Sequence, residues 1–346
     1  MFILFLSFSC KDKDIDPTVE LSYPTYFGDP KIPSDNLLTE NKILLGRKLF
    51  YEKKLSKDKT VSCGSCHVQK FAFSDPNTFS FGVEGQITTR NSMSLANLGW
   101  QNQFFWDNRS SSLEKQALIP IEAANEMNLP IEEAIARLQA SVEYRSLFNK
   151  VFGSPEITKE RLAQAISSFE RTLISGTSKY DLFKQGLTTF TQDEQDGERL
   201  FFTHPDPTTN LRGGNCGDCH SGLLTQSPDP RNNGLLITND TGIEALTGDP
   251  ENFGEFKTVS LRNIELTAPY MHDGRFKTLE DVLDHYNSPE AFKRQNVDPL
   301  ITLGTNDING TSLGLTDDEK RKIIAFLKTL TDYQFISDEK FSDPNQ

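Results

Sequence analysis

Two pentapeptides, CGSCH at residues 63–67 and CGDCH at residues 216–220, decide how this chain folds. In each, two cysteines three positions apart place both sulfurs near one edge of a flat macrocycle, where they can form thioethers to its vinyl groups. The histidine that follows presents its imidazole to the iron from one face. The sequence therefore predicts two covalently attached c-type haems, held by Cys63, Cys66 and His67 and by Cys216, Cys219 and His220.

Two other kinds of site use paired cysteines. A zinc site would take four thiolates and would leave both histidines without a role. A thioredoxin-like redox pair needs one CxxC at the start of a helix in a βαβ unit, and no such unit is indicated here. Covalent haem is the interpretation that uses all six residues.

The segments before the two pentapeptides are similar to each other. GRKLFY at 46–51 precedes the first, and GERLFF at 197–202 precedes the second. A helix that ends in leucine and two aromatic residues, a loop and CxxCH thus form one unit used twice. Helical spacing of apolar residues recurs, and no long stretch alternates with period two. We predict a mainly α fold with two cytochrome c-like haem lobes and long connecting loops, and with helices at 37–55 (Thr39 as N-cap), 130–150, 158–174, 278–286 and 317–333.

The N-terminal residues indicate export. MFILFLSFSC at 1–10 is a short apolar run that ends in cysteine, which is typical of a lipoprotein-type signal lipidated at Cys10. A secretory signal with an incidental cysteine is the alternative. Residues 11–33 then form a tether, 34–185 the N-terminal haem domain and 186–340 the C-terminal haem domain. The expected location is the periplasm, with contact to a membrane only through a lipid anchor, which agrees with haem attachment outside the reducing cytosol.

The formal net charge of −13 limits the possible partners. A nucleic-acid surface needs clustered Lys and Arg, and no basic run is present, so nucleic acid is excluded as a partner. An acidic surface suits a basic protein partner, although it serves solubility equally well.

The residues that could bind each iron from the other side differ between the two halves. Apart from His67, the chain has no histidine before His204. The remaining candidates, His272 and His285, also lie in the second half. The first haem therefore has no histidine cap from its own lobe, and His204 is given no role.

From residue 38 to residue 333 the chain resembles the bacterial di-haem cytochrome c peroxidase family, which includes the MauG branch. Ordered blocks around both motifs carry the resemblance: LGRKLFYEKKLS (45–56), VSCGSCH (61–67), TRNSMSLAN (89–97), FFWDNRSSSLEKQALIPIEAANEM (104–127), CGDCH (216–220) and TVSLRNIELTAPYMHDGRFKTLEDVLDHY (258–286). The resemblance implies a peroxidatic first haem that receives electrons from the second.

The resemblance also implies roles for single residues. Glu126 matches the family's acid/base glutamate, which moves a proton between the two oxygens of peroxide. Trp106 matches a tryptophan between the haems that is thought to relay electrons, and Arg109 belongs to the same block. One calcium ion between the domains is implied at a site made by Asn91, Thr267 and Pro269.

Two positions depart from the peroxidases that must be reduced before they react. Val83 stands where those enzymes have a histidine that caps the first haem, so we expect that haem to be open at rest. Tyr286 stands where the distal methionine of the second haem is usual, and the MauG branch has a tyrosine ligand there. Met271 is the alternative ligand, with His285 behind it.

The resemblance thus implies an enzyme, a cytochrome-c peroxidase that reduces hydrogen peroxide to water with electrons from a small cytochrome c or cupredoxin. Two alternatives stay open: MauG-like oxidation of a protein or small-molecule substrate, and electron transfer without catalysis. Members of the family are often dimers, so a homodimer is compatible with the resemblance.

Overall fold

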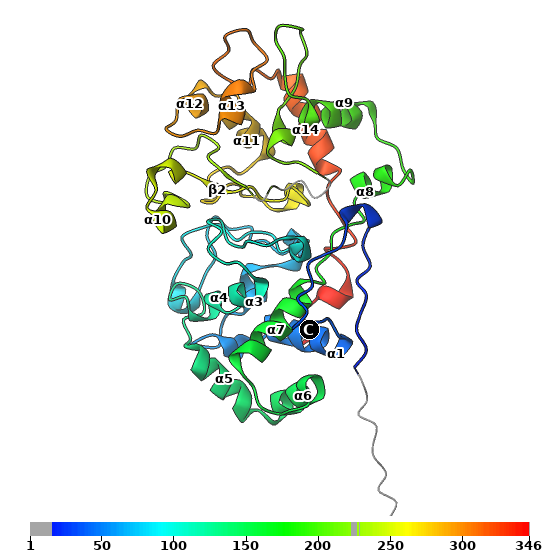
Figure 1. The fold of residues 1–346 in the computed structure, drawn as a ribbon, viewed down its shortest axis with the longest axis vertical. Coiled ribbons are helices and arrows are strands. Elements are labelled where there is room, and N and C mark those ends of the chain that lie inside the picture. Colours follow the sequence, from blue (N-terminus) through cyan, green and yellow to red (C-terminus); the bar gives the residue numbers. More distant parts are fainter. Residues whose placement is uncertain (1–15, 223–226, 228, 346) are drawn as a thin grey trace, which may run out of the picture.

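The computed structural model describes residues 16–222, 227 and 229–345, and within them it is mainly helical, as predicted (Figure 1). The chain forms two halves stacked along the long axis. The first runs from α1 (Glu40–Phe50) to α7 (Lys159–Glu170), and the second from α8 (Lys179–Lys184) to α14 (Asp317–Lys328). The predicted signal with Cys10 lies outside the described residues.

Each half is built on one pair of crossing helices, α1 with α7 and α9 (Gln192–Phe202) with α14. A Cβ on Gly46 of α1 would lie 1.9 Å from the carbonyl oxygen of Ala165, and one on Gly197 of α9 would lie 2.0 Å from that of Lys322. Only glycine allows so close an approach of two backbones. The unit that the sequence repeats is therefore repeated in the structure as well.

The last aromatic residue of each repeat supports its CxxCH motif. A Cβ on Gly64 would lie 2.4 Å from the ring of Tyr51, and one on Gly217 would lie 2.8 Å from the ring of Phe202. In both halves the glycine of the motif thus lies directly against an aromatic ring at the end of the preceding helix.

The helices follow the predicted spans with shorter ends. Thr39 is the N-cap of α1 as predicted, and Thr278 caps α11 (Leu279–Tyr286) by accepting a hydrogen bond from Asp281 N–H. The periodic stretch 130–150 forms two helices, α5 (Ile131–Ala140) and α6 (Val142–Phe152), because the Ser141 side chain caps a new helix there. Helix α14 ends at residue 328 rather than 333.

Short elements complete the chain. The segment 229–255 contains β1 (Pro230–Arg231), paired antiparallel with β2 (Phe256–Lys257), and α10 (Glu244–Thr247). The other short helices are α2 (Cys63–Cys66), α3 (Leu113–Gln116), α4 (Ile119–Glu122), α12 (Pro289–Phe292) and α13 (Pro299–Leu303).

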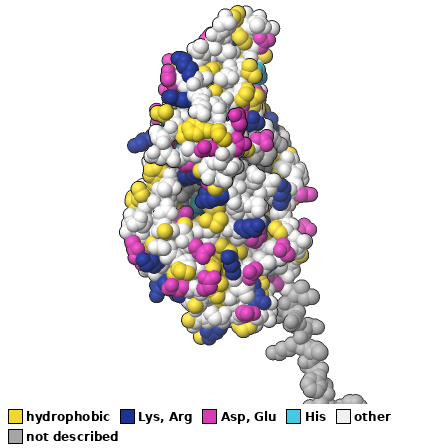
Figure 2. All heavy atoms as spheres, turned by 60° about the vertical axis from the view of Figure 1, so that its left-hand side comes forward, with side chains coloured by type: hydrophobic (Ala, Val, Ile, Leu, Met, Phe, Trp, Pro, Cys, Tyr) yellow, Lys and Arg dark blue, Asp and Glu magenta, His cyan; other side chains and the backbone are white. Residues whose placement is uncertain are grey.

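The surface carries both signs of charge. On the face shown in Figure 2, acidic and basic side chains are interspersed rather than gathered into a single-sign area. None of the helices in the described part of the chain is both long enough and apolar enough to cross a membrane.

Apolar cores fill both halves, and the end of the chain joins the first one. A cluster around Phe50, Phe73 and Phe169 also contains Phe335 and Phe341, which follow α14. Figure 1 accordingly marks the C-terminus beside α1. The tail therefore completes the first half, although the domain boundaries at 185 and 340 stay a prediction.

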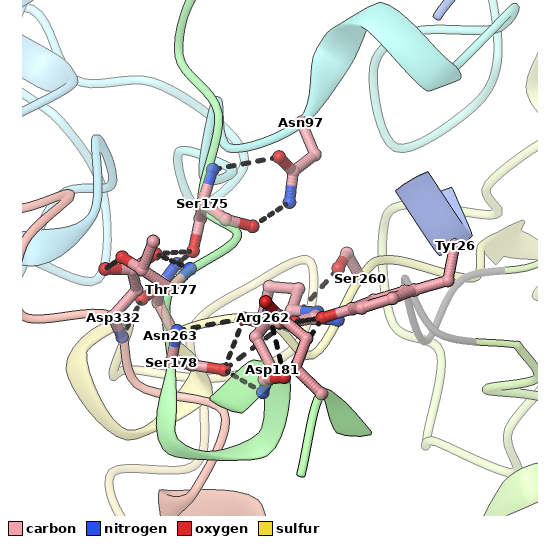
Figure 3. A network of polar contacts seen from close by, with 11 residues as sticks. Tyr26, Asn97, Ser175, Thr177, Ser178, Asp181, Ser260, Arg262, Asn263 and Asp332 are labelled. Atoms are coloured by element: carbon pink, nitrogen blue, oxygen red, sulfur yellow. Dashed lines mark hydrogen bonds and ion pairs between the residues drawn. The ribbon is translucent and has the colours of Figure 1, made fainter. Parts of the chain in front are cut away.

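A buried polar network joins the two halves (Figure 3). Arg262 and Asp181, both fully buried, form a 2.6 Å ion pair, and Tyr26 O–H donates to Asp181 at 2.9 Å. Asp332 accepts hydrogen bonds from Thr177 N–H and Oγ1, both at 2.8 Å. Asn97 of the first half donates to the Ser175 carbonyl oxygen at 3.0 Å, and Asn263 of the second half donates to Ser175 Oγ at 3.0 Å, so the network bridges the halves.

Candidate haem sites

The first motif occupies a short helix followed by a tight turn. Cys63 and Cys66 lie at the two ends of α2, and Ser62 N–H donates to Ser65 Oγ at 3.0 Å before its first turn. His67 follows, and its Nδ1–H donates to the carbonyl oxygen of Phe73 at 2.9 Å. This bond fixes the tautomer in which Nε2 has a free lone pair, the form that binds iron. Burial lowers the pKa of His67, which also favours the neutral form.

The second motif has the same proximal arrangement with a different partner. Cys216 begins a 3-10 turn (Cys216–Asp218), and His220 Nδ1–H donates to the carbonyl oxygen of Val259 at 3.1 Å. This acceptor is 39 residues away in the sequence, whereas the acceptor of His67 is 6 residues away. Both histidines are thus prepared to bind iron through Nε2.

The four cysteine thiols are held in the neutral form. Burial raises the pKa of the Cys63 thiol well above its usual value, and raises that of Cys66 to about 11, of Cys219 to about 11 and of Cys216 to about 12. Neutral thiols are poor nucleophiles for dithiol redox chemistry. Within the described residues, no group of three or more His, Cys, Asp or Glu side chains is placed to hold a metal ion. The residues present therefore fit covalent haem at each motif.

The second motif opens into a deep, mostly apolar hollow. His220, Met271 and Tyr286 line it together, with Leu283 and Ile323 among its apolar walls. Of the predicted ligands for the second iron, Tyr286 and Met271 are thus on the same cavity as His220. Which of them binds the iron stays a prediction.

Asn233 organises these candidate ligands. Its Nδ2 donates to the Met271 sulfur at 3.4 Å, and its carbonyl oxygen accepts from His285 Nε2 at 2.9 Å. His285 is therefore engaged with the backbone and does not line the hollow. Burial raises the pKa of the Tyr286 phenol, while the Asn233 side chain lowers it.

Close to the first motif, Val83 and Glu126 lie together. Val83 is fully buried, and its N–H donates to the Glu126 carbonyl oxygen at 2.8 Å. A Cβ on Gly82 would lie 2.3 Å from the Asn125 carbonyl oxygen, so this loop packs directly on the turn that carries Glu126. The Glu126 charge contributes to the raised pKa of the Cys63 and Cys66 thiols, so its carboxyl lies near the motif.

The Glu126 carboxyl has an unusual environment. Burial raises its pKa above the usual value, and the nearby Arg109 partly opposes this rise. Arg109 itself stacks on the Phe105 ring at 3.6 Å and donates to both carboxylate oxygens of Asp107 at 3.0 Å. A half-buried carboxyl with a raised pKa suits proton transfer near neutral pH.

Trp106 lies at the junction of the two halves. Its indole N–H donates to the Asn91 carbonyl oxygen at 2.8 Å, and its own carbonyl accepts from Lys257 N–H at 2.7 Å. Its ring meets the His272 ring edge-on at 6.5 Å, and His272 stacks on Phe256 at 3.7 Å. A chain of aromatic rings therefore crosses between the halves.

Comparisons of the chain with a family model and with known proteins point to the same family. The model of the di-haem cytochrome c peroxidase family matches residues 40–189. The methylamine utilization protein MauG of Methylophilus methylotrophus is 32% identical over 86% of this chain and 84% of its own length. The chain belongs to the di-haem cytochrome c peroxidase family. The resemblance seen in the sequence is thus confirmed, and the family implies two haem c groups, which the two motifs fit.

Relatives from both branches of this family are similar to the chain. The cytochrome c551 peroxidase of Nitrosomonas europaea is 34% identical over 83% of this chain and 79% of that protein. A crystal structure of a MauG-like protein associated with microbial copper homeostasis is 35% identical, covers 95% of this chain and 100% of that one, and superposes with a TM-score of 0.83. The similarity therefore supports peroxidase chemistry in general and leaves the two branches as alternatives.

The residues implied for the family's calcium site border one cavity. Asn91, Thr267 and Pro269 all line the hollow of the second motif. The Asn91 side-chain N–H groups donate to the carbonyl oxygens of Asn77 and Thr78, which orients its amide oxygen away from them. An amide oxygen and backbone carbonyls are ligands that calcium prefers. The calcium ion itself stays a prediction.

Several residues of the di-haem sites were missed in the sequence analysis. Lys257 is buried in the hollow, where its ammonium donates to Gln101 Oε1 at 2.6 Å and to the Gln103 carbonyl oxygen, both neutral groups. Burial lowers its pKa to about 8. Its position directly before the TVSLRN block was a usable signal. Phe73, Val259 and Asn233 act through backbone or amide groups, for which the sequence offers no signal.

Proposed function

We propose that this protein is a di-haem peroxidase that reduces hydrogen peroxide to water, with a first haem that is open without prior reduction. The observation that carries the proposal is the distal side of the first motif. There a fully buried valine, which cannot bind iron, packs beside Glu126. An open iron position next to a carboxyl is what peroxide activation requires.

The overall reaction takes one hydrogen peroxide, two electrons and two protons to two waters. The haem, when bound, would supply both the Lewis acid that binds peroxide and the two electrons that cleavage of the O–O bond consumes. The Glu126 carboxylate takes the proton from the oxygen that approaches the iron and returns it to the departing oxygen, which leaves as water. A raised pKa makes Glu126 a stronger base than an exposed glutamate. Arg109, held by Phe105 and Asp107, places a positive charge near this carboxylate.

Electrons are proposed to enter at the second haem from a small cytochrome c or cupredoxin. The net charge of −13 suits a basic donor. Trp106, with His272 and Phe256 beside it, supplies the aromatic path between the halves. We propose calcium at Asn91, Thr267 and Pro269 as a brace for this junction.

A MauG-like oxidation of a protein or small molecule is the second candidate. The observation that favours it is Tyr286, which shares a hollow with His220. A phenolate ligand stabilises ferric iron and lowers the potential, which favours high oxidation states over electron storage. Relatives named MauG are compatible with this alternative.

We also propose export to the periplasm with a lipid at Cys10. This location is the one in which c-type haem attachment proceeds, outside the reducing cytosol. A homodimer is compatible with the family.

Steady-state peroxide turnover with reduced cytochrome c or cupredoxin, measured on the wild type and on Glu126→Gln, tests the proposed function. Removal of a general acid/base costs about 100-fold or more in rate, so we expect that loss in Glu126→Gln with unchanged haem content. Glu126 must be deprotonated to act. The wild-type rate therefore falls as pH drops through its raised pKa, and this acid limb is absent in the variant.

The outcomes separate the alternatives. Rapid turnover that depends on Glu126 supports the peroxidase. Peroxide consumption without oxidation of the donor supports the MauG-like oxidase, and no reaction with peroxide supports a cytochrome that only transfers electrons.

A further inference from the structure

The last residues of the chain form a strap, residues 335–342, that returns to the first half. The strap starts at the junction network, where Phe335 N–H donates to Asp332 Oδ1 at 3.0 Å. It ends on α1, where Arg47 donates to the carbonyl oxygens of Ser342 at 2.6 Å and Glu339 at 2.8 Å. The strap is therefore fastened at both ends.

The strap lies against the segments that flank the first motif. Tyr51, whose ring supports Gly64 of the motif, donates through its hydroxyl to the Phe341 carbonyl oxygen at 2.7 Å. Gln69, two residues after His67, donates through Nε2 to the Asp338 carbonyl oxygen at 2.9 Å. The strap thus contacts residues that precede and residues that follow the first motif in the sequence.

Phe73 is the point where strap and haem ligand meet. Its ring packs against Phe335 at 5.5 Å and Phe341 at 6.4 Å between centroids, and all three side chains are buried. Its carbonyl oxygen accepts the Nδ1 proton of His67. The aromatic contact of the strap and the second bond of the iron ligand are therefore made by one residue.

The backbone at Phe73 needs this support. Ala72 and Phe73 have φ of 53° and 58°, the left-handed region that residues other than glycine rarely occupy. Two such residues in succession persist only where their surroundings hold them. The Phe335 and Phe341 rings provide those surroundings, because they pack on the Phe73 side chain.

We infer that the strap is a positioning element for the first haem: Phe335 and Phe341 keep the Phe73 carbonyl oxygen on His67 and so lower the reduction potential of that haem alone. A hydrogen bond from Nδ1–H to a carbonyl makes the imidazole a more basic ligand, and a more basic ligand favours ferric iron. His220 bonds instead to Val259, which lies outside this aromatic cluster. The inference needs the first haem to be attached but does not depend on peroxidase activity.

The test is a redox titration of the full-length protein with both haems bound, followed by absorption and electron paramagnetic resonance. In Phe335→Ala and Phe341→Ala we expect the first-haem potential to rise by about 59 mV, the tenfold change in the equilibrium of a one-electron couple. The second-haem potential stays constant. Phe335→Leu, which keeps an apolar side chain, is expected to retain the wild-type potential of the first haem.

Two further variants make the result decisive. Tyr333→Ala removes an aromatic residue next to the strap that is 66% exposed, and it leaves both potentials unchanged. His220→Met changes the proximal ligand of the second haem and so assigns the two redox waves. If the alanine variants do not assemble, Arg47→Gln removes the hydrogen bonds at the end of the strap without changing a core residue. We expect it to raise the potential of the first haem as well.

The inference is overturned if the folded strap variants leave the first-haem potential unchanged, or if both potentials move together. In the first case the strap only stabilises the fold. In the second it acts on the whole molecule and not through the bond between Phe73 and His67.

Discussion

The two CxxCH sites share their proximal chemistry and differ on the distal side. In each, an aromatic ring supports the motif, and a backbone carbonyl fixes the histidine tautomer. Beyond the first lie Val83 and Glu126, and beyond the second a hollow with Met271 and Tyr286. The motif therefore determines where haem attaches, and we propose that the residues on the other side decide what each haem does.

The halves also differ along their central helix pairs. Phe169 of α7 and Phe326 of α14 occupy matching positions, since each lies beside the glycine at its helix crossing. The next residue is Glu170 in the first half and Leu327 in the second. Both are buried, so the first half carries an acid where the second carries a hydrocarbon. The repeat is thus modified in the half that carries the first motif.

The largest effect is expected when the first site is given a side chain that can bind iron, like those of the second site. In Val83→His, an imidazole enters the buried position beside Glu126. We expect the oxidised first haem to become six-coordinate. Its reaction with peroxide should slow about 100-fold if the histidine leaves the iron in about 1% of the molecules at any time. Stopped-flow mixing with peroxide before and after reduction measures this.

A bulky side chain without a ligand atom provides the control. Val83→Phe fills the same space and leaves the oxidised haem five-coordinate. Equal slowing in both variants would mean that bulk, and not ligation, closes the site.

Replacing the buried acid, Glu170, tests the difference between the two helix pairs. Burial raises the pKa of Glu170 to about 8, and its Oε2 has no hydrogen-bond partner. A carboxyl with a raised folded-state pKa contributes stability that is full below about pH 4.5 and is lost as pH rises through about 8. Urea unfolding should show the wild type losing about 3 to 4 kcal/mol between pH 5 and pH 8 through this group.

The variants Glu170→Gln and Glu170→Leu, the second of which copies Leu327, remove that loss. Both are expected to show a flatter dependence of the free energy of unfolding on pH. A dependence as steep as that of the wild type would show that Glu170 is ionised in the folded protein.

The smallest effect concerns the second iron. Tyr286→Phe keeps the ring in the hollow and removes only the hydroxyl. We expect changed charge-transfer and low-spin signals from one haem, with the first haem and the stability unaffected. Met271→Leu is the matched variant: if it alone changes these signals, methionine is the ligand and Tyr286 is not.

The sequence predicted the features that depend on local pattern. Two CxxCH motifs, the repeated helix before them and the Thr39 cap all depend on residues close together in the chain. It also identified the family. The placement of Tyr286 and Met271 on one hollow, by contrast, needs the folded chain.

What the sequence did not indicate depends on contacts across long separations. Phe335 meets Phe73, and Asn233 meets both Met271 and His285, through packing and backbone groups that leave no pattern. Glu170 lies on the same helical face as Ile166 and Ala163, but its charge predicts exposure, and the burial of its carboxyl is seen only in the fold.

Electron paramagnetic resonance of the fully oxidised protein, recorded before any reductant is added, tests the inequality of the two sites most directly. We predict one high-spin signal from the open first haem and one low-spin signal from the capped second haem, with the high-spin signal lost on addition of stoichiometric peroxide. Two low-spin signals, and no reaction with peroxide until one haem is reduced, would contradict it.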